Sequence, residues 1–214
     1  MGSRTALRVV LKRHADRRPA LTAGTYQGVV FDMDGTLIEP LLDFERLRSE
    51  LGVPPEMGIL EVLDAMDPAE AAGRRRMLIE HELLAARTAA LHPGAVETLG
   101  AIRAAGLKTA LLTRSAAEAM AVVIERFGLR FDLAWSRENG PIKPEPDGIL
   151  RACRQLGIAP AATACVGDFR YDMLAANAAG AVAILLARNS MPDFAGLARH
   201  VITELDQLPG LLGI

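Results

Sequence analysis

The sequence contains no long apolar run, because no stretch reaches the roughly 18 residues that a membrane-spanning helix needs. Cysteine is scarce: Cys153 and Cys165 are too few for a disulfide framework, and their spacing is not that of metal ligands. The formal net charge of −2 provides no overall positive field that would attract nucleic acid. We therefore expect a protein that binds neither membranes nor nucleic acid and that lies in the reducing cytoplasm.

Charge is unevenly distributed along the chain, since residues 1–27 hold five Arg and one Lys against a single Asp. An Arg-rich, acid-poor N-terminus is typical of an organelle transit peptide. The same segment also fits a basic helical lead-in, because its apolar residues recur at helical spacing. We favour the lead-in and interpret residues 1–27 as a basic N-terminal extension.

From residue 28 onward, short apolar runs alternate with stretches of helical pattern. The runs are mostly apolar rather than alternating, which is typical of strands buried on both faces, and cover residues 28–31, 107–112, 131–135, 163–166, 182–186 and 201–203. Helices are expected over residues 93–105, 115–128, 146–157 and 170–179, with a glycine at or just after each end. This alternation predicts an α/β fold, a doubly wound domain with a mostly parallel sheet.

Residues 38–92 break this rhythm, because they contain no good strand pattern. Helices are expected near residues 43–51, 58–66 and 69–91. We therefore predict a small helical cap at 38–92, inserted after the first strand, and a core domain made of 28–37 and 93–214. Ligands of such folds bind at the carboxyl ends of the strands, so a cap leaving from that point would lie over the site.

Charged and polar residues lie in the stretches that follow four of the expected strands. They are Asp32, Asp34 and Gly35 after the first, Thr113 and Arg114 after the second, Lys143 after the third, and Asp168 and Asp172 after the fourth. Parallel strands bring these ends to one edge of the sheet. The edge therefore gathers four carboxylates beside a lysine.

Carboxylates that lie this close repel one another unless a cation intervenes. An all-oxygen site without His or Cys suits a hard ion, Mg²⁺ above all. Lys143, one of only three lysines against 21 arginines, would attract a phosphate, as would the helix start after Thr113. A carboxylate can act as the nucleophile in phosphoryl transfer, so the pattern predicts that chemistry.

The residues that follow the four strands form four motifs in chain order. The first is Asp32–Gly35, the second Thr113 and Arg114, the third Lys143, and the fourth Asp168–Asp172. In order and in position at strand ends, they resemble the four motifs of the haloacid dehalogenase superfamily, over residues 28 to about 187. The predicted cap resembles the small C1 type, and the general pattern is similar to the phosphoglycolate-phosphatase-like subgroup. The resemblance implies a Mg²⁺-dependent phosphatase, a phosphoric monoester hydrolase that acts on a small phosphorylated metabolite.

The resemblance also implies a catalytic role for each motif residue. Asp32 would attack phosphorus and carry the phosphoryl group, while Asp34 would protonate the leaving oxygen and then deprotonate water. Thr113 would hydrogen-bond the phosphoryl oxygens, and Lys143 would hold both Asp32 and the phosphate. Gly35 would let the chain turn tightly away from the first strand, beside the bound phosphate.

For the metal, the resemblance implies that Asp32, Asp168 and the backbone carbonyl of Asp34 ligate Mg²⁺. Asp172 would support the metal directly or through water. Arg114 departs from the Asn that more often follows the Thr of the second motif, and we include it as a candidate substrate-binding residue. The run 74–76 of three arginines could also grip an anion, but we favour a solvated helix face.

Related activities are open alternatives at this point. A haloacid dehalogenase would need neither Asp34 nor Asp168, and a phosphonate hydrolase would need a cap lysine, which residues 38–92 lack. A sugar phosphomutase uses the same aspartyl-phosphate, although Thr36 leans toward hydrolysis. A non-catalytic phospho-ligand-binding protein on this scaffold should have lost a charged motif residue, whereas all are present. The residues therefore favour a phosphatase.

Overall fold

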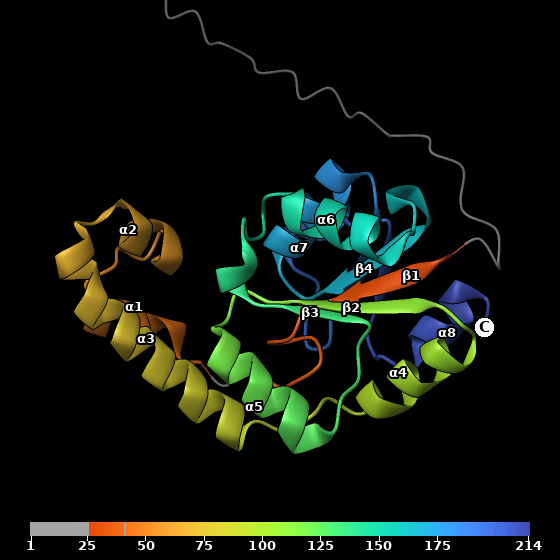
Figure 1. Ribbon diagram of the computed structural model, residues 1–214, viewed down its shortest axis with the longest axis horizontal. Coiled ribbons are helices and arrows are strands. Elements are labelled where there is room, and N and C mark those ends of the chain that lie inside the picture. Colours follow the sequence, from red (N-terminus) through yellow and green to blue (C-terminus); the bar gives the residue numbers. More distant parts are fainter. Residues whose placement is uncertain (1–25, 41) are drawn as a thin grey trace, which may run out of the picture.

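The computed structural model describes residues 26–40 and 42–214. Six strands form one sheet in the order β3-β2-β1-β4-β5-β6, and every neighbouring pair is parallel (Figure 1). The strands are β1 (Gly28–Phe31), β2 (Lys108–Leu112), β3 (Leu133–Trp135), β4 (Thr163–Gly167), β5 (Val182–Leu186) and β6 (His200–Ile202). The predicted α/β fold with a parallel sheet is therefore confirmed.

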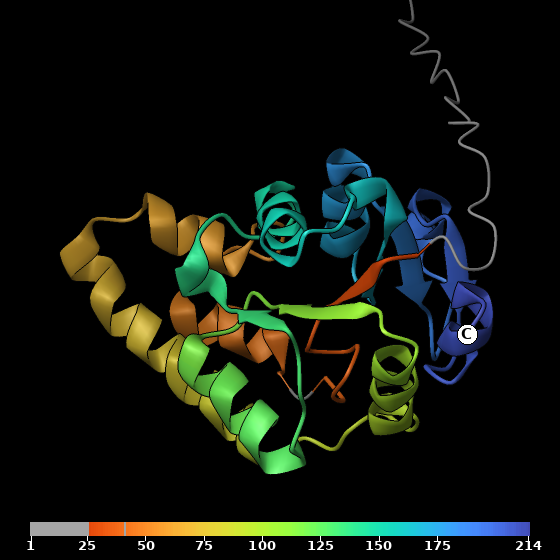
Figure 2. The ribbon, with the colours of Figure 1, turned by 45° about the vertical axis from the view of Figure 1, so that its right-hand side comes forward.

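Helices cover both faces of this sheet, as Figures 1 and 2 show. On one face lie α6 (Asp147–Leu156) and α7 (Arg170–Ala179), and on the other lie α4 (Ala95–Ala104), α5 (Ala117–Phe127) and α8 (Gln207–Leu212). Short 3₁₀ turns complete the layers: η1 (Arg137–Asn139), η2 (Pro160–Ala162) and η3 (Asp193–Leu197). None of the described helices is long and apolar enough to cross a membrane.

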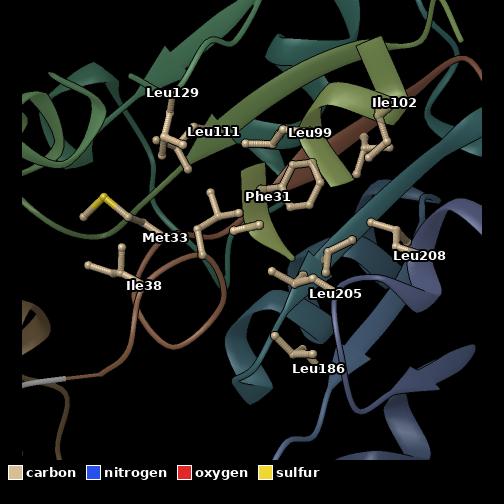
Figure 3. Packing of buried hydrophobic residues seen from close by; sticks show 14 of the residues in the cluster. Phe31, Met33, Ile38, Leu99, Ile102, Leu111, Leu129, Leu186, Leu205 and Leu208 are labelled. Atoms are coloured by element: carbon tan, nitrogen blue, oxygen red, sulfur yellow. The ribbon is translucent and has the colours of Figure 1, made fainter. Parts of the chain in front are cut away.

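Strand β1 shows how the sheet divides the interior into two apolar layers. Val29 and Phe31 point into the layer that α4, α5 and α8 cover, where Phe31 packs near Leu99 and Leu111 (Figure 3). Val30 points into the opposite layer, beneath α6 and α7. Successive side chains of a strand face opposite sides, so an unbroken apolar run fits a strand buried on both faces.

The strand order places a topological switch point beside β1. The chain passes from β1 to β2 and β3 on one side, then crosses over to continue with β4 on the other side. Connections that leave in opposite directions open a crevice at the carboxyl ends of the two central strands. Asp32, directly after β1, and Asp168, directly after β4, lie at that crevice.

Residues 38–40 and 42–92, which we call the helical insert, carry α1 (Phe44–Leu51), α2 (Ile59–Ala65) and α3 (Pro68–Thr88). Helix α3 begins where a helix N-terminus is favoured, because the Asp67 side chain accepts from Ala69 N at 2.9 Å and Pro68 follows. The two linkers of the insert lie side by side: Glu39 N donates to Ala90 O at 2.9 Å, and His92 N donates to Leu37 O at 2.9 Å.

The insert has an apolar cluster of its own: Leu47, Leu51, Val53, Ile59, Leu60, Leu63 and Leu78. Helix α3 belongs to both clusters, because Leu78 packs with the insert while Leu83 and Ala86 pack with the main core. The division into a cap at 38–92 and a core stays a prediction. Of the predicted N-terminal extension, only Tyr26 and Gln27 fall within the described residues.

Several element boundaries differ from the sequence-based expectation by a few residues. The helix expected over 115–128 begins at Ala117, after a turn in which Ser115 N donates to Thr113 Oγ1 at 3.0 Å. The strand expected from 131 begins at Leu133, since the Asp132 side chain accepts from Thr109 N at 2.8 Å. Local side-chain hydrogen bonds of this kind compete with helix and strand continuation.

Candidate active site

The turn after β1 brings the first two predicted carboxylates to the edge of the sheet. Asp32 N donates to Val166 O of β4 at 2.9 Å, which extends the strand pairing by one residue. Gly35 has φ +80° and lies against Asp168, so that a Cβ at this position would overlap the Asp168 carboxylate. The sequence places glycine here because the chain must both turn and let that carboxylate approach.

Three carboxylates converge beside this turn. One oxygen from each of Asp32, Asp168 and Asp172 lies within 4.8 Å of the others. Lys143 Nζ pairs with Asp32 and, at 2.6 Å, with Asp172 Oδ1, so the lysine joins two of the three acids. Thr36 Oγ1 donates to Asp168 Oδ1 at 3.4 Å. An all-carboxylate donor set without His or Cys fits a hard divalent cation such as Mg²⁺.

Burial dominates the electrostatics of this cluster. It raises the pKa of Asp32 well above its usual range, although Lys143 opposes the shift. Burial and the adjacent Asp172 raise the pKa of Asp168 to about 7. Burial alone would lower the pKa of Lys143, but Asp172 and Asp32 outweigh it and raise that pKa. Lys143 is therefore charged. A bound cation would lower the raised pKa values of Asp32 and Asp168 and so favour their ionised forms.

Asp34 contacts two hydroxyl groups at the end of β2 and is not one of the three converging carboxylates. Its Oδ2 accepts hydrogen bonds from Ser115 Oγ at 2.6 Å and from Thr113 Oγ1 at 3.4 Å. Burial raises the pKa of Asp34, and the two hydroxyls oppose that shift. The carboxylate therefore lies apart from the metal-type cluster, as suits a proton carrier. The predicted ligation of metal by the Asp34 backbone carbonyl stays a prediction.

Arg114, the departure from the usual second motif, is held by three protein groups. Its Nη1 donates to Lys143 O, its Nη2 pairs with Glu61 Oε1 of α2 at 2.8 Å, and its guanidinium lies 4.7 Å from the centre of the Tyr171 ring. Arg114 therefore connects the helical insert to the loop that carries Lys143. Its role as a substrate-binding residue stays a prediction.

The arginine run of the insert is used within the insert itself. Arg74 donates to Leu51 O at 2.7 Å and pairs with Glu70 at 3.1 Å, and Arg75 pairs with Asp64. These contacts connect α3 to α1 and α2, and they direct both guanidinium groups to acceptors of the insert. They favour the interpretation of residues 74–76 as part of a helix face, and not as a site that binds an anionic substrate.

Sequence reasoning did not assign a role to two features of the site. Ser115, two residues after Thr113, was visible as a hydroxyl near a strand end, but its bond to Asp34 was not. The other feature is a pair of charged side chains, Glu82 of α3 and Arg137 of η1, with Glu82 Oε1 2.5 Å from Arg137 Nη1. No local pattern relates two residues this far apart in the chain.

A family model and two curated relatives match most of this chain. The family model for haloacid dehalogenase-like hydrolases matches residues 26–180. A haloacid dehalogenase-like hydrolase domain-containing protein of Arabidopsis thaliana is 31% identical over 172 residues, which cover 75% of this chain and 70% of that protein. A phosphoglycolate phosphatase of Chromobacterium violaceum is 30% identical over 185 residues, 74% of this chain and 83% of the relative.

A solved structure agrees with the fold. The crystal structure of a HAD phosphatase from Thermococcus onnurineus superposes with a TM-score of 0.66 at 25% sequence identity. The superposition covers 87% of this chain and 98% of the other.

Proposed function

Because this chain belongs to the haloacid dehalogenase-like hydrolase family, we propose that it is a Mg²⁺-dependent phosphatase that forms an aspartyl-phosphate on Asp32. The observation that carries the proposal is the arrangement of Asp32, Lys143 and Asp34. Asp32 is paired with Lys143 beside two further acids, and Asp34 is held separately by two hydroxyls. A nucleophile and a proton carrier thus lie in different environments at one edge of the sheet.

The metal would be held by the carboxylates of Asp32, Asp168 and Asp172, whose oxygens already converge. When bound, Mg²⁺ neutralises these acids and stabilises the negative charge that develops on a transferring phosphoryl group. Lys143 keeps its proton and contributes a fixed positive charge next to the nucleophile. Its second partner, Asp172, holds the ammonium group in that position.

In the first half-reaction, a carboxylate oxygen of Asp32 attacks phosphorus and the bond from phosphorus to the ester oxygen breaks. Asp34 donates its proton to the departing alkoxide, which leaves as an alcohol. In the second half-reaction, Asp34 takes a proton from a water molecule as the water oxygen attacks the same phosphorus. Asp32 then departs as a carboxylate, and inorganic phosphate is released.

The substrate that we propose is a small phosphomonoester. Relatives named phosphoglycolate phosphatase, from Chromobacterium violaceum and Thiobacillus denitrificans, make phosphoglycolate the first compound to test. The helical insert reaches the site through Arg114 and Glu61, so it is placed to select the leaving group. Selection by an element that closes over the substrate is common in enzymes of this kind.

The test is hydrolysis of p-nitrophenyl phosphate and phosphoglycolate, with Mg²⁺ and with EDTA, by the natural sequence and by Asp32→Asn. We expect Mg²⁺-dependent turnover that the substitution abolishes, because an amide is a poor nucleophile and a weaker metal ligand. Thermal unfolding of both proteins controls for folding. Full activity in EDTA would refute the metal assignment, and steady turnover by Asp32→Asn would refute the covalent mechanism.

A further inference from the structure

Glu82 is a buried carboxylate that joins the helical insert to the core beside the active site. It lies on α3, its exposed fraction is 6%, and both of its oxygens contact groups outside that helix. Oε1 accepts from Arg137 Nη1 at 2.5 Å, and Oε2 accepts from Ala116 N at 3.2 Å. A charge is buried at this depth only when it is paired and hydrogen-bonded, as it is here.

The contact with Ala116 caps helix α5 from another element. Ala116 is the N-cap residue of α5, and its methyl side chain cannot accept a hydrogen bond from the first turn. Glu82 accepts from the N–H of Ala116 itself, and its negative charge lies at the favourable end of the helix dipole. Helices α3 and α5 run side by side in both views, which is what brings Glu82 to this position (Figures 1 and 2).

Arg137 extends the same contact to the other side of the turn. Its Nη1, already paired with Glu82, also donates to Arg114 O at 3.1 Å. The Glu82–Arg137 pair therefore holds residues 113–116 at two points, one on Arg114 and one on Ala116. We call residues 113–116 the β2–α5 turn. Its geometry depends on a side chain of the insert as well as on its own residues.

The β2–α5 turn carries the two hydroxyls that hold Asp34. Ser115, whose hydroxyl lies 2.6 Å from Asp34, is between the two points that the Glu82–Arg137 pair holds. Thr113 Oγ1 accepts from Ser115 N at 3.0 Å, so the two hydroxyls move with the turn as a unit. A shift of the turn would therefore change the direction of the Asp34 carboxylate.

We propose that Glu82 is a positioning residue, which fixes the β2–α5 turn so that Ser115 and Thr113 orient Asp34 for proton transfer. The inference rests on the proposed function, since it assigns Asp34 the role of acid and base. Without Glu82 the N–H of Ala116 loses its acceptor and Arg137 loses its buried partner. Misplacement by about 1 Å can cost roughly 10²-fold in rate even when the change lies away from the chemistry.

The test compares Glu82→Ala with Glu80→Ala, an exposed glutamate on the same helix, on two substrates. Phosphoglycolate has a poor leaving group that needs a proton, whereas p-nitrophenolate leaves readily without one. We expect Glu82→Ala to lower kcat on phosphoglycolate by about 10–100-fold with little change in KM, and to lower kcat on p-nitrophenyl phosphate much less. In an Asp34→Asn background the same substitution should add little further loss.

A second variant covers the case in which Glu82→Ala does not fold. Glu82→Leu with Arg137→Met removes both charges together, and such paired replacement of buried ions is often neutral for stability. It should show the same substrate-dependent loss of kcat, because the turn again loses its contacts at Arg114 and Ala116. Equal losses on both substrates, or none, would overturn the role of Glu82 while the phosphatase assignment stands. No turnover of either substrate by the natural sequence would overturn both.

Discussion

Gly35→Ala is the substitution whose consequence the structure specifies most closely. Gly35 has φ +80°, a conformation that costs an L-residue about 1–2 kcal/mol. An alanine Cβ would also lie 2.6 Å from Asp168 Cγ, whereas an ordinary contact is 3.4–4 Å. The Oδ2 of Asp168 would lie closer still, so the Asp168 carboxylate must withdraw by more than about an ångström from the position in which it converges with Asp32 and Asp172.

Two effects of different size follow from this displacement. The backbone strain alone should lower Tm by about 2–8 °C, given the usual shift per kcal/mol for a chain of this length. Displacement of a predicted metal ligand should weaken Mg²⁺ affinity by about 10–100-fold, the loss usual when the support of a ligand is removed. Because Asp32 stays in place, kcat at saturating Mg²⁺ should change much less than the Mg²⁺ concentration that gives half activity.

The assay is phosphatase activity as a function of Mg²⁺ concentration, together with thermal unfolding in EDTA. Gly100→Ala is the matched control, since Gly100 is an exposed helical residue of α4 and an added methyl group there would meet no atom within 4 Å. That control should be slightly more stable, by about 0.5–1 kcal/mol, with an unchanged Mg²⁺ response. An unchanged Mg²⁺ midpoint for Gly35→Ala would refute the placement of Asp168 as a ligand.

Three further predictions concern neighbouring residues. The pKa of Asp168 is raised to about 7 from 3.8, so without metal its stabilising contribution is complete below about pH 3.8 and is lost as pH rises through 7. In EDTA the Tm of the natural sequence relative to Asp168→Asn should thus fall between pH 5 and 8; a rise would contradict this sign. Glu61→Gln should change the free energy of unfolding by less than about 1 kcal/mol, because the Glu61 side chain is 46% exposed in its pair with Arg114. The same substitution should alter KM for phosphoglycolate, and an unchanged KM would argue against a role of this contact in substrate selection. Ser115→Ala should lower kcat more for phosphoglycolate than for p-nitrophenyl phosphate, as measured by steady-state kinetics, because Asp34 loses its nearest donor; equal losses would contradict the link to Asp34.

The sequence by itself determined the class of fold and the set of residues at the sheet edge. Runs such as 28–31 and 182–186 are apolar throughout, and in segments this short, set between helical stretches, that pattern is typical of strands buried on both faces. In a parallel sheet the residues after each strand must meet at one edge. The order of motifs along the chain was therefore enough to group Asp32, Lys143 and Asp172, which the fold brings into contact.

Only the tertiary structure decided how those residues divide into separate environments. It separated Asp34 from the carboxylate triad, joined Arg114 to Glu61, and buried Glu82 against Arg137. Local patterns report which face of an element is apolar, but they do not report which distant charge will meet that element. The partners of these ion pairs lie on elements whose contact depends on how the helical insert packs against the core, and that packing is a property of the whole chain.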